Sequence, residues 1–318
     1  MLINPLTPKK FYLALMLAAL FIMPITLFAQ NITVIYDKNS QYQTNFLELI
    51  SKHFLPSEKV NLSTLTTDSL DVEKLKNKLL DIIINLNNAT TQQLIESKIN
   101  TTTFHALTTL SRARGFVSCL PNCIEKQSKQ YFFVLDQPPA RQLNLIRLVS
   151  PSFKNIGVIV TNQSKNQLTE LKKLATYKKL TINGHITRSK TVRYQIDDLS
   201  KYSDVILAIA DTDLYNAATL PQILLTSYRY KTPIIGFSKG FIRAGAIVGA
   251  VSSIEQLAQH LAEAISSISN INQPFGTSII YPKYFRVISN RNVAKSLNMH
   301  LPNDHELQNQ LMNYESTQ

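Results

Sequence analysis

Two aspartates and one arginine are the residues of this chain whose types and spacing best suit ligand chemistry. Asp211 and Asp213 follow the apolar run 204–210, and together they could accept hydrogen bonds from an ammonium or hydroxyl group. Arg243 lies in the glycine-rich stretch 234–250, where its guanidinium could hold a carboxylate by two parallel hydrogen bonds. Two alternatives stay open: Asp213 could cap a helix, and Arg243 could pair with either aspartate instead of a ligand.

Polar residues recur at equivalent places in the two halves of the chain. The stretches 85–91, 161–167 and 210–216 each follow a short apolar run and precede a segment with helical periodicity. Such residues would lie at helix N-termini, where unpaired N–H groups and the helix dipole favour an anion. Ordinary helix capping explains the same residues, but their recurrence in both halves favours a ligand role.

The arrangements that catalysis requires are missing from the sequence. It has no G-x-S-x-G, no H-E-x-x-H, no G-x-x-x-x-G-K-[ST], and no G-x-G-x-x-G after an apolar run. The six histidines are dispersed, and His105 fits a packed core position better than a cleft position. We therefore expect a protein that is not an enzyme and that uses no cofactor and no metal.

The elements that must position these residues follow a simple rhythm. Short β-branched runs alternate with longer amphipathic segments over residues 31–150, and the rhythm restarts after Pro151. Strands are expected at 32–37, 59–65, 81–86, 101–108, 156–160, 180–187, 204–210, 232–238 and 284–290, and helices at 42–54, 68–80, 90–98, 164–179, 194–202, 214–230, 253–268 and 293–299. This alternation predicts an α/β fold of two Rossmann-like lobes with parallel sheets and helices on both faces.

The length of 318 residues also favours two lobes, because it exceeds the usual size of one hydrophobic core. We expect the first lobe to comprise residues 31–150 plus about 248–272, and the second to comprise 151–247 plus about 280–302, with several crossovers between them. Residues 303–318 are expected to form a polar tail.

Four of the eight glycines lie in the stretch 234–250: Gly236, Gly240, Gly245 and Gly249. Glycine allows unusual backbone angles and close approach, and ligands of open α/β sheets bind beyond the carboxyl ends of the strands. We therefore expect this stretch to be a hinge and a wall of the ligand cleft.

The N-terminus has the order of a secretory signal. Lys9 and Lys10 precede an apolar run that ends in a small residue, which predicts cleavage near Ala29 or Gln30 and a periplasmic protein. A retained anchor helix is the alternative. No cysteine follows the apolar run, so there is no lipoprotein attachment site.

The net charge of +12 is compatible with nucleic acid, an anionic envelope surface or simple solubility, and export argues against nucleic acid. The only cysteines, Cys119 and Cys123, enclose a Pro-Asn pair. In an oxidising compartment a short disulfide loop is the favoured interpretation, ahead of a metal site or a redox pair.

The stretches 133–160, 204–250 and 282–302 together resemble the ABC-transporter substrate-binding protein family that includes tryptophan and tyrosine transport components. The resemblance implies the type-1 periplasmic binding-protein fold, two lobes that close over a ligand. It also implies ligand contacts at the following residues: Asn88, Ala89, Thr108, Asn162, Asp211, Asp213, Ser238, Arg243 and Gly245. The chain departs from the family at Asn87 and Asn88, where members commonly have Gly-Thr, and this affects the identity of the ligand.

The function that the resemblance implies is capture of a small polar or amino-acid-like ligand between the lobes for an ABC import system. The partners would be that ligand and an ABC permease in the inner membrane, the protein would be a monomer, and nucleic acid would not be a partner. The alternative hypothesis is a periplasmic sensor or adaptor subunit of a membrane signalling receptor with the same fold.

Overall fold

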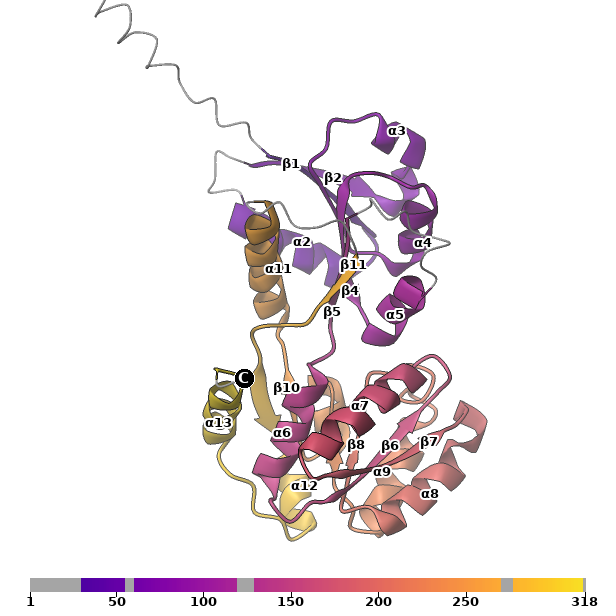
Figure 1. Ribbon diagram of the computed structural model, residues 1–318, viewed down its shortest axis with the longest axis vertical. Helices are drawn as coiled ribbons and strands as arrows, with labels where there is room; N and C mark the ends of the chain where they lie inside the picture. The colour runs from indigo at the N-terminus through magenta and orange to yellow at the C-terminus, as the bar shows by residue number, and fades with distance from the viewer. Residues whose placement is uncertain (1–29, 55–59, 119–128, 270–276, 317–318) are drawn as a thin grey trace, which may run out of the picture.

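Two six-stranded sheets organise the chain in the computed structural model, which describes residues 30–54, 60–118, 129–269 and 277–316. The sheet orders are β11-β5-β4-β3-β1-β2 and β12-β10-β9-β8-β6-β7, and the two lobes built on them lie end to end (Figure 1). All strand pairs are parallel except the pair of β10 and β12. The predicted α/β fold with two parallel sheets is confirmed.

The first lobe contains two strands and one helix that the periodicity did not reveal, namely β5, β11 and α5. Its strands are β1 (Gln30–Tyr36), β2 (Val60–Thr66), β3 (Ile82–Asn85), β4 (Thr102–Thr108), β5 (Gln130–Val134) and β11 (Thr277–Ile280). Its helices are α2 (Gln41–Phe54), α3 (Val72–Lys76), α4 (Asn88–Glu96), α5 (Leu110–Ser118) and α11 (Ile254–Ser269).

The second lobe gains β10, α6, α10 and α13 relative to the expected elements. Its strands are β6 (Asn155–Val160), β7 (Thr181–Ile186), β8 (Val205–Leu207), β9 (Ile234–Ile235), β10 (Val248–Val251) and β12 (Arg286–Ser289). Its helices are α6 (Pro139–Val149), α7 (Lys165–Tyr177), α8 (Val192–Tyr202), α9 (Leu220–Arg229), α10 (Lys239–Ala244), α12 (Arg291–Ser296) and α13 (Asp304–Ser316).

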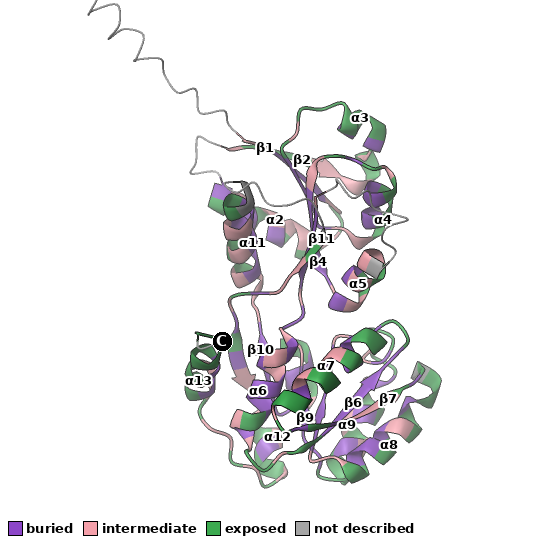
Figure 2. Ribbon diagram, in the orientation of Figure 1, coloured by how far each residue is buried: buried purple, intermediate pink, exposed green. Residues whose placement is uncertain are grey.

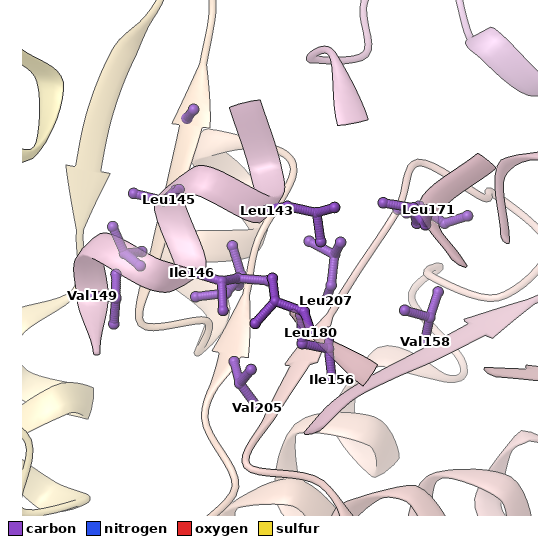
Figure 3. Close-up of a cluster of buried hydrophobic side chains, with 14 of the residues drawn as sticks. Leu143, Leu145, Ile146, Val149, Ile156, Val158, Leu171, Leu180, Val205 and Leu207 are labelled. Atoms are coloured by element: carbon purple, nitrogen blue, oxygen red, sulfur yellow. The ribbon is translucent and has the colours of Figure 1, made fainter. Parts of the chain in front are cut away.

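Each sheet is buried between two layers of helices (Figure 2). In the first lobe α2 and α11 cover one face, and α3, α4 and α5 cover the other. In the second lobe α6, α7 and α13 cover one face, where Leu143, Ile146 and Val149 of α6 pack against the strands (Figure 3). These three residues recur at helical spacing, so they form one apolar stripe. The opposite face carries α8, α9 and α10.

The chain crosses between the lobes at residues 135–138, 252–253 and 281–285. Two expected boundaries need correction. Residues 248–251 belong to the second sheet and not the first, because β10 pairs with β9 and β12 and is buried throughout. Residues 304–316 are not a loose tail: they form α13, whose Leu307 and Leu311 lie one helical turn apart and are fully buried.

The glycine-rich stretch 234–250 forms β9, α10 and β10 inside the second lobe, so it is not the hinge that we expected. Gly236 and Gly249 serve close packing. The Gly236 N–H donates to the Val248 carbonyl at 2.8 Å, and a Cβ on Gly249 would lie 2.2 Å from the Gly236 carbonyl oxygen. Residues 1–29, where the secretory signal is predicted, lie outside the described residues. The predicted loop between Cys119 and Cys123 lies outside them as well.

We expect Gly249→Ala to lower the free energy of unfolding by about 2 kcal/mol, because the added methyl would collide with backbone that cannot move without separating β9 from β10. Urea denaturation measures the loss. Gly240→Ala is the matched control: its Cβ would meet nothing nearer than 4.0 Å, and alanine suits a helix better than glycine. Equal midpoints for the two variants would contradict the close-packing role.

Candidate functional site

The carboxyl edges of the two sheets face one another. From the carboxyl ends of β5 and β10 the chain passes directly into the other lobe. All other strands except β12 run parallel to β5 in the first sheet or to β10 in the second. The turns between strands and helices of both lobes therefore meet in the space between the lobes (Figure 1). Ligands of open α/β sheets bind at this edge.

The second lobe has a polar hollow of about 390 Å³ at this edge, at the ends of β6, β7 and β8. It is lined by Thr161, Asn162, Gln163, Thr187, Arg188, Thr212, Asp213 and Asn216. The predicted residues Asn162 and Asp213 are both exposed here and lie together with the guanidinium of Arg188. A carboxylate, a guanidinium, amides and hydroxyls in one hollow suit a small ligand that carries charges of both signs.

Asp211 is buried beneath this hollow and holds its walls together. One carboxylate oxygen accepts from the Thr161 N–H at 3.0 Å, from the Thr161 hydroxyl at 2.8 Å and from the Ser164 hydroxyl, and the other accepts from the Asp213 N–H at 3.1 Å. These donors belong to the turns after β6 and β8. Asp211 is therefore a positioning residue beneath the hollow, and its oxygens are already engaged.

Arg243 and Gly245 lie at the opposite edge of the second sheet, so the structure does not bring them together with Asn162 and Asp213. α10 carries the chain back toward the start of β10, so residues in its last turn lie far from the carboxyl edge. Arg243 lines a depression that includes Asn290 and Asp304, and no ion pair of the described residues joins it to Asp211 or Asp213.

Two further features of α10 have local explanations. Ser238, at the carboxyl edge, caps the helix by accepting from the Phe241 N–H at 3.1 Å. Gly245 ends the helix with φ of +151°, a left-handed value that favours glycine, and it packs against Leu224. Of these two, only Ser238 lies near the facing edges.

The first lobe presents Asn88 and Ala89 in the first turn of α4. The Ala89 N–H donates to the side-chain oxygen of Asn87 at 2.7 Å, and the Asn88 amide donates to the Leu107 carbonyl at 3.3 Å. Leu107 has a left-handed φ of +56° at an irregularity in β4 and is followed by Thr108, which is buried. Asn88 and Ala89 therefore lie at the facing edge, whereas Thr108 lies beneath it.

A buried polar network supports this edge from inside the first lobe. The His105 ring lies between Asn85, whose amide is 3.2 Å from Nδ1, and Gln130, whose Oε1 is 2.8 Å from Nε2. An amide donor at Nδ1 and a carbonyl acceptor at Nε2 assign the hydrogen to Nε2 of a neutral imidazole. Burial lowers the pKa of His105 to about 4, against a smaller opposing effect of Gln130. His105 is thus a core residue.

One ion pair joins the lobes beside the site. Arg114 of α5 pairs with Glu170 of α7, and Tyr281 of the third crossover lies against both. Burial raises the pKa of the Tyr281 hydroxyl to about 12, and the Glu170 carboxylate contributes to the increase. Near this pair, Gln163 of the second lobe lines a hollow of about 550 Å³ between α4 and α5 and donates to Asp213 at 3.2 Å. The α5 and α7 helices therefore contact each other across the gap.

Asp136, at the start of the first crossover, is expected to oppose His105 in the pH dependence of stability. Burial raises the pKa of Asp136 to about 6. The hydrogen bond from the Leu110 N–H at 2.7 Å and the charge of Arg114 lower this pKa, but by less than burial raises it. The contribution of Asp136 to stability is greatest at pH values below about 4, its pKa in the unfolded chain. This contribution is lost as pH rises through 6. The neutral His105 behaves in the opposite way: its contribution is lost as pH falls from 6.5 through 4.

Asp136→Asn should therefore make the protein more acid-sensitive than the wild type. Relative to the wild type, we expect the variant to lose about 3 kcal/mol of unfolding free energy between pH 6.5 and pH 4, because the Asp136 contribution no longer offsets that of His105. Urea titrations at the two pH values measure the difference. A variant whose midpoint keeps a constant offset from the wild type would contradict the assignment.

Thr187 and Arg188 escaped the sequence analysis, whereas Gln163 and Tyr215 lie in the predicted stretches 161–167 and 210–216 without being named as site residues. Thr187 and Arg188 follow β7 as Thr161 and Asn162 follow β6, so the rule applied to the other turns would have found them. The Tyr215 ring packs against Phe237 and Phe241. Its hydroxyl is buried and has no hydrogen-bond partner among the described residues, and burial together with the Asp211 charge raises its pKa.

Metal chemistry and a membrane span find no support in the described ranges. Within residues 30–54, 60–118, 129–269 and 277–316, histidine, cysteine and carboxylate side chains do not gather in groups of three or more. In the same ranges no helix has the length and apolar character to cross a bilayer.

Comparison with known proteins agrees with this geometry. The sequence model of the ABC transporter substrate binding protein family matches residues 57–308, while a search of curated protein sequences finds no match.

A ligand-free, open substrate-binding protein with adhesive properties from Clostridium difficile superposes with a TM-score of 0.62 at 18% identity, covering 87% of this chain and 97% of that one. An ABC domain in complex with L-Trp from Streptococcus pneumonia gives 0.57 at 16% identity, covering 86% and 96%. A conserved domain protein from Vibrio cholerae gives 0.53 at 16% identity, again covering 86% and 96%. The fold is that of type-1 periplasmic binding proteins.

Proposed function

Because the chain belongs to the ABC transporter substrate-binding protein family, we propose that it captures a small polar or amino-acid-like solute between its lobes and delivers it to an ABC permease. The observation that carries the proposal is the polar hollow at the carboxyl edge of the second sheet, where Asp213 and Arg188 lie together. The L-Trp complex of the streptococcal neighbour supports a ligand of amino-acid type. The site of action would be the periplasm of the exported chain, which would act as a monomer.

The hollow offers complementary groups to a zwitterion. Asp213 would accept hydrogen bonds from the ligand ammonium, and Arg188 would hold the ligand carboxylate. Asn162 would add an amide beside them. The first lobe would complete the site with the first turn of α4, where Asn88 and Ala89 lie at the carboxyl edge of the first sheet.

Ligand capture would work by a shift between an open and a closed arrangement of the lobes. A ligand that contacts both edges binds the closed arrangement more tightly and so increases its population. The Arg114–Glu170 pair joins the lobes on one flank, so it would favour approach of α5 to α7. No covalent step is required.

The test is a thermal-shift panel of amino acids and small metabolites, followed by calorimetry with the best ligand. Arg188→Gln should weaken that ligand at least about tenfold, the effect of losing a charged hydrogen-bonding partner. Arg243→Gln is the matched control, since it makes the same change in the same lobe at the opposite edge of the sheet. A panel without any shift, or equal losses in both variants, would count against the proposal.

A further inference from the structure

Three helices of the second lobe end at one edge of the sheet, and each ends on an exposed tyrosine beside basic residues. These ends are residues 177–179 at the end of α7, 201–202 at the end of α8 and 229–231 at the end of α9, including the residues that directly follow α7 and α9, and we call them the distal face. Tyr177 is 78% exposed and Tyr202 is 61% exposed. Because the helices run antiparallel to the strands, the distal face lies at the edge opposite the polar hollow.

The ends of α8 and α9 adjoin. The Tyr230 hydroxyl donates to Asp197 of α8 at 3.1 Å, and the Lys201 ammonium lies 5.1 Å from the centre of the Tyr202 ring. The pKa of Lys201 is raised, first by a hydrogen bond with Tyr202 and further by the charges of Tyr202, Tyr230 and Asp197. Two tyrosines and their lysine therefore form one patch.

The end of α7 continues this patch along the sheet edge. Lys154 joins the two parts, because its N–H donates to Asp204 at 2.8 Å, just after α8, and its carbonyl accepts from the Thr181 N–H at 2.8 Å, just after α7. Arg147 lies near Lys178. Burial lowers the pKa of Lys178, and the charge of Arg147 lowers it further. Positive charge is thus crowded at this edge.

The charge is also unequally divided between the lobes. Residues 139–251 and 282–316 of the second lobe hold 20 lysines and arginines against 9 aspartates and glutamates, a formal charge of +11. The described residues of the first lobe hold 9 against 10, a formal charge of −1. The basic surplus of the chain is therefore a property of one lobe.

Helix capping accounts for only part of the distal face. Basic side chains are favoured near helix C-termini by the helix dipole, but the dipole does not favour exposed tyrosines. Lys179 and Lys231 occupy left-handed positions with φ of 56° and 55°, where glycine is the least strained residue. Lysine is present at both positions in spite of that strain.

We propose that the distal face binds the surface of an anionic lipid bilayer. Tyrosine rings are favoured at the level of the lipid headgroups, and lysines and arginines near an anionic bilayer are attracted to its phosphates. The basic groups lie on separate helix ends along one sheet edge, which suits a flat partner with mobile charges. The polar hollow would then point away from the bilayer and stay open to solute.

The experiment measures binding of the chain from Gln30 onward, which includes both complete sheets, to vesicles of phosphatidylglycerol and phosphatidylcholine. Lys179→Gly and Lys231→Gly each remove one charge and place glycine at a left-handed position, so the fold is retained. We expect each to lower the partition coefficient about fivefold at low salt. Tyr202→Ser should lower it as well, because headgroup contact requires the ring.

Lys98→Gly is the matched control, with the same change at φ of 55° in the first lobe, and it should leave vesicle binding within about twofold of the wild type. Failure to bind anionic vesicles at low salt would overturn the proposal, and so would an equal loss in Lys98→Gly. Tighter binding to a short DNA duplex with the same dependence on Lys179 and Lys231 would overturn it in favour of nucleic acid. Solute affinity should be unchanged in all of these variants, so the result is independent of the proposed transport function.

Discussion

Arg141→Met should lower the free energy of unfolding by about 3 kcal/mol. Arg141 is only 3% exposed, and its guanidinium is held by a carboxylate and two carbonyl oxygens. Glu315 is exposed, so its carboxylate can be solvated in the variant. The carbonyl oxygens of Gln137 and Pro282 would lose their donor, at about 1–3 kcal/mol for each buried group, or about 3 kcal/mol together.

The contacts of Arg141 explain why its loss would affect the whole molecule. Its guanidinium donates to both oxygens of Glu315 in α13, one of them at 2.7 Å, to Gln137 of the first crossover at 2.6 Å, and to the carbonyl of Pro282 in the third crossover at 2.9 Å. Gln137 in turn donates to Ser252 of the second crossover at 2.9 Å. One side chain therefore connects all three crossovers with the C-terminal helix.

Urea denaturation followed by fluorescence and by circular dichroism measures this effect. Arg147→Met is the matched control, because Arg147 lies on the same helix but is exposed, and we expect it to cost less than about 0.5 kcal/mol. Glu315→Gln keeps an acceptor for Arg141 and should fall between the two. A loss below about 1 kcal/mol in Arg141→Met would show that the crossovers do not depend on this connection.

The sequence predicts the fold better than it predicts the boundaries of the lobes. Alternation of apolar runs with amphipathic segments is a local signal, and it identified most elements of both sheets. Which sheet a strand joins depends on partners far away in the chain, and β10 shows this: it was placed in the first lobe but pairs with β9 and β12. The role of Arg141 was equally invisible, since Glu315 lies 174 residues away.

The structure brings predicted site residues together where one rule applied without interruption. Asn162 and Asp213 follow strands β6 and β8 directly, and parallel strands bring their carboxyl ends to one edge. Arg243 failed the same rule because α10, only six residues long, had already carried it back along the sheet. Proximity in sequence to a strand end is therefore informative for a few residues only.

Asp211 and Asp213 illustrate a second limit, because two residues of one type and nearly one position have different roles. Asp211 is buried and accepts four hydrogen bonds, whereas Asp213 is exposed in the hollow. Sequence alone treats them as a pair. Their environments separate them, and substitution at each position should affect a different property of the protein.

Asp211→Ala should lower the free energy of unfolding by about 4 kcal/mol, because the hydroxyls of Thr161 and Ser164 and the Asp213 N–H lose their acceptor. The Thr161 N–H would keep only the Ser164 hydroxyl oxygen at 3.1 Å. Each buried donor left unpaired costs about 1–3 kcal/mol, and partial repair by rotation of the hydroxyls keeps the total below the sum. The turns after β6 and β8 would separate, so ligand affinity should also fall, as a consequence of lost structure.

Asp213→Ala provides the contrast that makes this prediction decisive. It should change the unfolding free energy by less than about 1 kcal/mol, since the side chain is exposed and has one bond of 3.2 Å to Gln163. It should nevertheless weaken the ligand about tenfold through loss of the ammonium partner. If Asp211→Ala unfolds at the wild-type urea concentration, or if Asp213→Ala destabilises the fold as much, the assignment of support to one aspartate and ligand contact to the other is wrong.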